Sequence, residues 1–247
     1  TAGNVTTPEL GTPLNVFEYR PDQNSSEIDV ATILAGLLNG GSGGEVILDT
    51  SDSALVGALT GEQGNININA AINFATSITG PAKLTLRAHN DINVNSVISS
   101  SLGILNVDFT SDQDEAAGGN INVNAAISSN GGTVQFIGDE VNLNSGGVVT
   151  THGSLSTGNI AVEANDLSIN TGAGAVLDTS QGLSNGNILI RTRFNNQSQN
   201  ISLGYATAVA GTLSIETNEF TNGLNAGDSK GNVIIGSSSH QGNITVG

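Results

Sequence analysis

The 247-residue sequence contains no cysteine, methionine or tryptophan, and only 3% of its residues are aromatic. Without cysteine, the chain has no disulfide framework, no cysteine-ligated zinc and no cysteine nucleophile. Lysine and arginine together number 6 against 22 aspartates and glutamates, which gives a net charge of −16. Nucleic acids and anionic membranes both require clustered basic residues, so the charge excludes these two classes of partner.

Long apolar runs are missing as well. No stretch of about 18 consecutive apolar residues is present, so the sequence predicts no membrane-spanning helix. No basic segment followed by an apolar one opens the chain at Thr1, and we expect either that a signal was removed or that the sequence begins inside a larger protein. Isoleucine, leucine and valine are spread evenly, which favours a folded chain over a disordered one.

The sequence is rich in one short repeated phrase, in which apolar residues alternate with asparagine. Successive copies begin 26, 29, 20 and 26 residues apart, at Ile66, Ile92, Ile121, Val141 and Leu167. Apolar residues at every second position are typical of a half-buried strand. The 33 glycines, with Asn, Asp and Ser, supply residues favoured in tight turns. A self-similar unit of this length, holding two or three short strands, predicts the coils of a parallel β-solenoid.

Two other folds are less consistent with the pattern. A helix requires apolar residues at i, i+3, i+4 and i+7, and no window beyond residue 40 keeps that spacing. A sandwich or barrel would show hairpin turns of fixed length. We therefore predict one all-β solenoid over residues 45–247, with roughly eight coils stacked about 4.8 Å apart. Asparagines at equivalent positions are expected to hydrogen-bond along the stack as amide ladders.

The amino-terminal residues differ from the rest. Residues 1–26 hold three of the four prolines and are predicted to form an extended arm, in which Val16, Phe17 and Tyr19 are the candidate assembly residues. Residues 27–44 are predicted to form a short helix and a turn that cover the exposed end of the first coil.

The helix has a recognisable start signal. Ser26-x-x-Asp29 is similar to a capping box, and the apolar residues that follow predict about ten to twelve helical residues. The opposite end of the solenoid has no such cover, because the sequence reaches Gly247 within a strand phrase. Ile244 and Val246 are therefore the candidate open stacking edge.

The segments Val46–Thr50, Gly64–Ile72, Leu84–Ala88 and Asp91–Asn95, after the helix that begins near Ile28, resemble a known repeat. They are similar to the repeat region of filamentous-haemagglutinin-like exoproteins, large secreted bacterial adhesins of the two-partner secretion type. The resemblance covers about residues 27–247. It implies a right-handed parallel β-helix, export across the outer membrane and display at the cell surface.

Many parallel β-helices are polysaccharide-degrading enzymes, so catalysis is the third hypothesis. Glycoside hydrolysis uses two carboxyl groups about 5–10 Å apart. The candidate carboxylates belong to separate repeats, and His152-Gly153 is the one further hint of such a site. The candidate carboxylates are Asp49, Glu163, Asp178 and Glu216. We expect no enzymatic activity, no catalytic residues and no cofactor.

The sequence also offers little for a metal ion. The densest acidic segment, Ser111–Glu115 with Asp108 nearby, is interpreted as a solvated loop rather than a calcium site. The three histidines, His89, His152 and His240, belong to distant repeats and predict no metal cluster.

The most unusual local feature is a basic and aromatic insertion at Arg191, Arg193 and Phe194. Such a loop on an acidic rod is suited either to an acidic patch of a neighbouring subunit or to a glycan, and a solvated loop is the simpler interpretation.

These observations leave two main hypotheses. The first is an extracellular structural protein whose copies stack end to end, or join through the arm, into a surface filament. The second is a segment of a large secreted adhesin that binds cell-surface or host glycans. A natural chain that ends at Gly247 favours the filament, and one that continues favours the adhesin.

Overall fold

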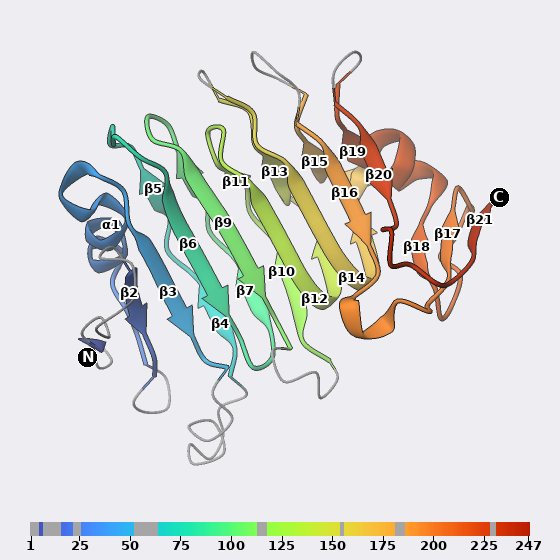
Figure 1. Ribbon diagram of the computed structural model, residues 1–247, viewed down its shortest axis with the longest axis horizontal. Helices are drawn as coiled ribbons and strands as arrows, with labels where there is room; N and C mark the ends of the chain where they lie inside the picture. Colours follow the sequence, from blue (N-terminus) through green and yellow to red (C-terminus); the bar gives the residue numbers. More distant parts are fainter. Residues whose placement is uncertain are drawn as a thin grey trace.

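Parallel β-sheet predominates in the structure. The computed structural model describes residues 5–6, 16–21, 26–51, 64–112, 118–153, 156–180, 186–227 and 231–247. Short strands stack side by side into an elongated rod, with the amino terminus at one end and the carboxyl terminus at the other (Figure 1). The predicted all-β fold of parallel sheet is therefore confirmed.

One long stack of parallel strands, which we call face 1, runs along the rod. Strands β12 and β14 contribute their first halves to face 1. Its members, in stacking order, are β2 (Val16–Tyr19), β3 (Glu45–Asp49), β6 (Ala82–Arg87), β9 (Leu105–Thr110), β12 (Val134–Leu143), β14 (Ile160–Ile169), β16 (Ile188–Arg191) and β20 (Val233–Ile235). At the outer edge of β2, the two-residue strand β1 (Val5–Thr6) pairs in the antiparallel sense.

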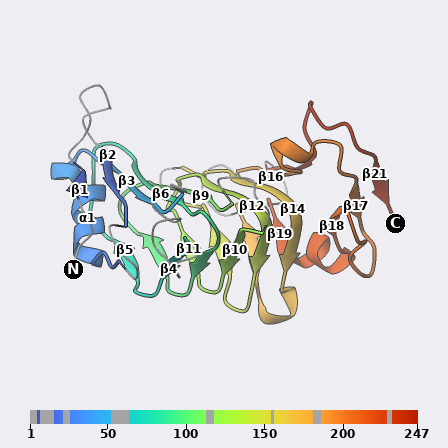
Figure 2. The same cartoon turned by 90° about the horizontal axis from the view of Figure 1, so that it is seen from below.

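Two further stacks curl around the same core (Figure 2). Face 2 consists of β4 (Ile66–Ile68), β7 (Ile92–Val94), β10 (Asn120–Val123) and the second halves of β12 and β14. Face 3 consists of β5 (Ile72–Phe74), β8 (Ile98–Ser100), β11 (Ile127–Ser128), β13 (Val148–Thr150), β15 (Val176–Asp178) and β19 (Leu224–Asn225). Because β12 and β14 pass from face 1 to face 2 without a break, they define the corner between these faces.

The predicted repeat is confirmed residue by residue on face 2. The five phrase starts pair with one another in register, so the steps of 26, 29, 20 and 26 residues are the steps of the stack. These side chains are buried. Inside face 1, Phe109 and Phe136 lie on adjacent strands with ring centroids 5.8 Å apart. Each coil thus completes its core against its neighbours, as expected for stacked strands.

Two asparagine ladders follow face 2 on its outer side, as the sequence predicts. In the first, the side-chain amide of Asn122 donates to Oδ1 of Asn93 at 2.9 Å and accepts from Asn142 at 3.2 Å. The second ladder repeats this pattern two residues further along each strand, through Asn69, Asn95, Asn124 and Asn144. The ladders fix the register because a slip by one residue would break every bond in both.

Glycines allow close backbone contact at the corner between face 3 and face 1. A Cβ on Gly158 would lie 2.0 Å from the carbonyl oxygen of Gly132, and one on Gly186 would lie 2.0 Å from that of Gly158. Buried hydroxyls secure the same corner, since Thr151 and Thr179 donate at 2.7 Å to the carbonyls of Gly158 and Gly186. This corner therefore excludes any side chain at the stacked glycines.

Helix α1 (Val30–Leu38) packs against β3, β5 and β6 at the amino-terminal end of the rod (Figure 1). It has nine residues, slightly fewer than expected, and it begins at Asp29, whose Oδ1 accepts a hydrogen bond from the Thr32 N–H at 2.8 Å. The capping-box interpretation that began at Ser26 was therefore wrong, because Asp29 itself is the N-cap. Short helical turns also occur at η1 (Asn39–Gly41), η2 (Thr171–Ala173), η3 (Phe194–Asn196) and η4 (Glu219–Gly223).

The carboxyl-terminal strands do not stack in chain order. Strands β17 (Ile201–Leu203), β18 (Leu213–Ile215) and β21 (Ile244–Val246) form a parallel sheet in the order β18–β17–β21. Strand β18 contacts β14, so the later strand lies closer to the rest of the rod than the earlier one. None of the helices in the described part of the chain has the length and hydropathy of a membrane span.

Candidate functional site

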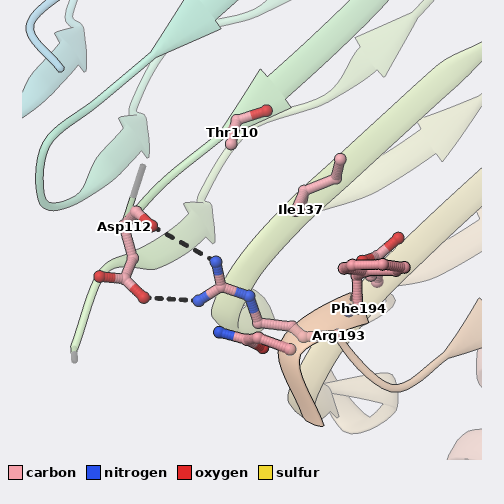
Figure 3. A pocket seen from close by; sticks show the side chains of 7 residues that line it. Thr110, Asp112, Ile137, Arg193 and Phe194 are labelled. Atoms are coloured by element: carbon pink, nitrogen blue, oxygen red, sulfur yellow. Dashed lines mark hydrogen bonds and ion pairs between the residues drawn. The ribbon is translucent and has the colours of Figure 1, made fainter. Parts of the chain in front are cut away.

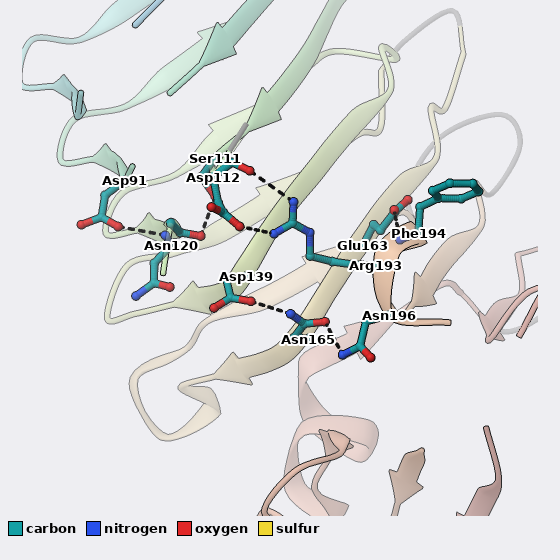
Figure 4. Close-up of polar contacts among 11 residues, drawn as sticks. Asp91, Ser111, Asp112, Asn120, Asp139, Glu163, Asn165, Arg193, Phe194 and Asn196 are labelled. Atoms are coloured by element: carbon teal, nitrogen blue, oxygen red, sulfur yellow. Dashed lines mark hydrogen bonds and ion pairs between the residues drawn. The ribbon is translucent and has the colours of Figure 1, made fainter. Parts of the chain in front are cut away.

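A network of polar contacts surrounds the basic insertion at the corner between face 1 and face 2 (Figure 4). Four residues lie in register across neighbouring strands on the outer side of face 1: Thr110, Ile137, Glu163 and Arg191. After Arg191 the chain leaves face 1 and forms η3 before it enters the carboxyl-terminal sheet at β17. The insertion therefore lies beside β12 and β14, which continue through the corner.

Arg193 and Asp112 form a buried ion pair at this corner. Nη1 of Arg193 lies 2.5 Å from Oδ2 of Asp112, and Nη2 donates to the backbone carbonyl of Asp112 at 3.3 Å. Both residues are at most 5% exposed. The sequence analysis treated the acidic segment and the basic insertion separately, and the structure brings them together. Asp112 is thus not the solvated side chain that we expected, while residues 113–115 lie outside the described residues.

Glu163 fixes the start of the insertion. Its Oε2 accepts from Nε of Arg191 at 2.9 Å and lies 2.7 Å from Nη2 of the same residue. Its Oε1 accepts from the backbone N–H of Phe194 at 2.8 Å. Further along, Asn196 donates to Oδ1 of Asn165 at 3.0 Å. The backbone at Phe194 is consequently held by a charge-assisted hydrogen bond, which is the stronger kind.

A small open hollow of about 120 Å³ lies between the insertion and face 1 (Figure 3). We call it the corner hollow, and its lining residues are Thr110, Asp112, Ile137, Glu163, Arg193, Phe194 and Asn195. The Phe194 side chain remains 79% exposed, although its backbone is fixed. Of the three residues predicted to interact, Arg191 and Arg193 pair within the chain and Phe194 faces solvent.

The candidate assembly arm contributes directly to the stack. Val16, Phe17 and Tyr19 belong to β2, which pairs with β3 in parallel register. Phe17 and Tyr19 pack against the core, and burial together with the negative charge of Asp29 raises the pKa of Tyr19. The β-branched and aromatic residues of this segment are a strand signal that the arm interpretation did not use.

The candidate stacking edge is exposed. Ile244 and Val246 are 49% and 74% exposed, whereas Ile201, the register partner of Ile244 on β17, is fully buried. Strand β21 is the last strand of its sheet in the described structure.

The carboxylates considered for catalysis lie apart. Asp49 and Glu163 occupy the same column of face 1 but are separated by four strand spacings, about 19 Å. Asp178 belongs to face 3, where its carboxylate accepts from the N–H and hydroxyl of Ser180. Among the described residues, no group of three or more His, Asp or Glu side chains is arranged to hold a metal ion.

Sequence reasoning missed a second group of carboxyls near the carboxyl-terminal end. Burial raises the pKa of Asp166, and the charges of Glu140 and Glu216 raise it further. Burial also raises the pKa of Glu219, whose two oxygens accept from the backbone N–H groups of Ile169 and Glu216 at 2.6 and 2.9 Å. No sequence signal places these residues together, because β18 and η4 stack out of chain order.

Comparison of this chain with protein-family models, curated proteins and solved structures finds no match. The resemblance to filamentous-haemagglutinin-like exoproteins therefore remains a prediction that rests on the repeated phrases.

Proposed function

We propose that the chain is a structural subunit of an extracellular filament, a right-handed β-solenoid of roughly eight coils that lengthens by end-to-end stacking. Right-handed crossovers are strongly preferred between parallel strands, which supports this handedness. The acidic, cysteine-free composition and the resemblance of the repeats to surface exoproteins support an extracellular location.

The exposed edge at β21 carries this proposal. Its apolar residues continue a column that is buried one strand earlier, at Ile201. A further parallel strand would bury Ile244 and Val246 and pair with the edge backbone groups. A second copy offers such a strand at its amino-terminal end, where β2 and β4 are the first members of faces 1 and 2. Head-to-tail contact between different surfaces generates an open filament rather than a closed dimer.

At this end of the rod helix α1 packs against β3, β5 and β6, and strand β1 covers the outer edge of β2, so the contact requires β1 to be displaced. Strand β1 pairs with β2 through two residue pairs, Val5 with Tyr19 and Thr6 with Glu18. When another copy stacks at β2, its three-residue strand β21 replaces the two-residue strand β1 and pairs with β2 in the parallel sense. The exchange is favourable because it adds buried apolar surface.

Electron microscopy of the natively purified protein, with intact mass measured on the same sample, tests the proposal. We expect regular fibres built from the 247-residue unit of 24.8 kDa. Val246→Lys places a charge at the edge and should leave short rods. Val97→Lys is the matched control, since Val97 is also exposed but precedes β8, a strand that is paired on both sides. Isolated rods of the unchanged protein, or a much heavier parent chain, would contradict the filament.

A glycan-binding adhesin segment is the second candidate. The observation that favours it is the exposed Phe194 ring beside the corner hollow. Neither candidate includes a catalytic activity, a cofactor or a nucleic-acid partner.

A further inference from the structure

The corner hollow combines features that filament stacking does not use. It lies on face 1, in the register column of Thr110, Ile137 and Glu163. Single exposed apolar side chains are common on protein surfaces, so exposure alone does not mark the Phe194 ring as part of a site. Here its backbone is secured by the hydrogen bond to Glu163, and the preceding residue by the buried ion pair of Arg193 with Asp112. The ring is therefore displayed at a defined place rather than on a loose loop.

The charges of the corner hollow are balanced. Asp112 and Glu163 supply two carboxylates, and Arg193 and Arg191 supply the two guanidiniums that pair with them. The carboxylates would attract a cationic ligand only weakly, because the two guanidiniums already neutralise their charge. An anionic ligand would have to approach a chain with a net charge of −16. The electrostatics consequently favour an uncharged ligand.

The shape and chemistry of the hollow narrow the class of ligand further. An aromatic ring offers a flat apolar platform, and Asn195, the next residue in the chain, and Thr110, across the hollow, also line it. Each oxygen of a carboxylate has more than one acceptor position, so Glu163 retains acceptor capacity beyond its bonds to Arg191 and Phe194. A pyranose ring has one apolar C–H face and equatorial hydroxyls, which match a platform flanked by acceptors and donors.

From these observations we infer that the corner hollow is a binding subsite for a neutral hexopyranose unit of a glycan, with Phe194 as the stacking platform. The hollow is smaller than a typical ligand pocket, so it holds a single ring that stays partly in solvent. One such site binds weakly. Many copies carried on one rod or filament would bind strongly through multivalency.

Saturation-transfer NMR tests the inference on the purified protein, with the methyl glycosides of glucose, galactose, mannose and N-acetylglucosamine as probes. We expect at least one glycoside to show saturation of the C–H protons of one ring face. Phe194→Ala should weaken this binding about tenfold or more, and Phe194→Tyr should preserve it. Phe220→Ala is the matched control, because Phe220 is also exposed but belongs to η4, outside the hollow.

Thermal unfolding of each variant separates a loss of the site from a loss of the fold. Absence of binding to all four glycosides would overturn the inference, and so would undiminished binding by Phe194→Ala. Binding of sialyllactose or a sulfated oligosaccharide without binding of the neutral glycosides would show that the ligand is anionic, and would overturn the inference of a neutral sugar. The measurement does not require fibres, so its outcome is independent of the filament proposal.

Discussion

Arg193 and Asp112 are 81 residues apart in the sequence and form an ion pair that is nearly inaccessible to solvent. Two strands, β12 and β14, lie between the strands that precede these residues, β9 and β16. The guanidinium therefore joins levels of the stack that have no direct backbone hydrogen bonds to each other.

Removing one partner of this pair should be costly. Arg193→Ala leaves the Asp112 carboxylate buried without its counter-ion, and we expect a loss of roughly 3–5 kcal/mol in the free energy of unfolding. Lys83→Ala is the control, because its ammonium and both of its carboxylate partners, Glu45 and Asp108, are partly exposed, so about 1 kcal/mol or less is expected. Urea denaturation measures both values. Equal losses in the two variants would contradict the structural role of the buried pair.

The asparagine ladders predict a position-dependent effect. Asn122→Ala removes one hydrogen bond as donor and one as acceptor, whereas Asn67→Ala removes one bond at the end of the ladder. At about 1 kcal/mol per bond, Asn122→Ala should cost about twice as much as Asn67→Ala. Chemical denaturation of the two variants gives the comparison, and an equal cost would show that the ladder bonds add little to stability.

The stacked glycines predict a sharp contrast between two alanine substitutions. Gly158→Ala forces a Cβ into the carbonyl of Gly132, and a loss on the order of 4 kcal/mol is expected because the backbones must separate. Gly172→Ala places its Cβ no closer than 3.8 Å to another atom, so a change within about 0.5 kcal/mol is expected. Thermal unfolding distinguishes the two, and tolerance of alanine at residue 158 would refute the close contact.

The buried carboxyls predict a dependence of stability on pH. Burial raises the pKa of Asp166 above its unfolded value, so its protonated form is favoured in the folded chain. Its contribution to stability is therefore fully present below the unfolded pKa and is lost as the pH rises through the folded pKa. Asp166→Asn should raise the unfolding temperature at neutral pH, and the difference should vanish in acid. A difference that persists in acid would mean that ionisation is not its cause.

Glu219 is a second buried carboxyl whose pKa is raised. Each of its two oxygens accepts a backbone hydrogen bond, from Ile169 and from Glu216. Glu219→Gln turns one acceptor into a donor that faces an N–H group, and this should cost about 1–3 kcal/mol at neutral pH. The unfolding temperature of this variant should therefore fall at neutral pH, and an unchanged value would contradict the two hydrogen bonds.

The sequence predicts the regular part of the fold because alternation and register are local signals. Ile66 and Ile92 carry the same phrase, and apolar residues at every second position can face one core in a single register. The asparagine ladders follow directly, since equal positions on stacked strands lie side by side. Val16–Tyr19 has apolar residues but not the strict alternation of the repeated phrase, and the prolines around it suggested an arm where the structure has a strand.

The contacts of the corner hollow could not be predicted from the sequence, for a physical reason. Arg193 meets Asp112 because β12 and β14 run straight through a corner at which β9 and β16 end. Strand length at a corner depends on how neighbouring coils pack and not on a local pattern. The order β18–β17–β21 was equally unpredictable, because each phrase reads alike and the chain alone does not specify which of two similar strands lies closer to β14.

A load along the length of a parallel stack acts on each interface between neighbouring strands, and the weakest interface separates first. The bridge from Arg193 to Asp112 bypasses three interfaces, those of β9 with β12, β12 with β14 and β14 with β16. Under tension the strands from β9 to β16 therefore stay together as one block, and separation begins at the strand interfaces on either side of this block.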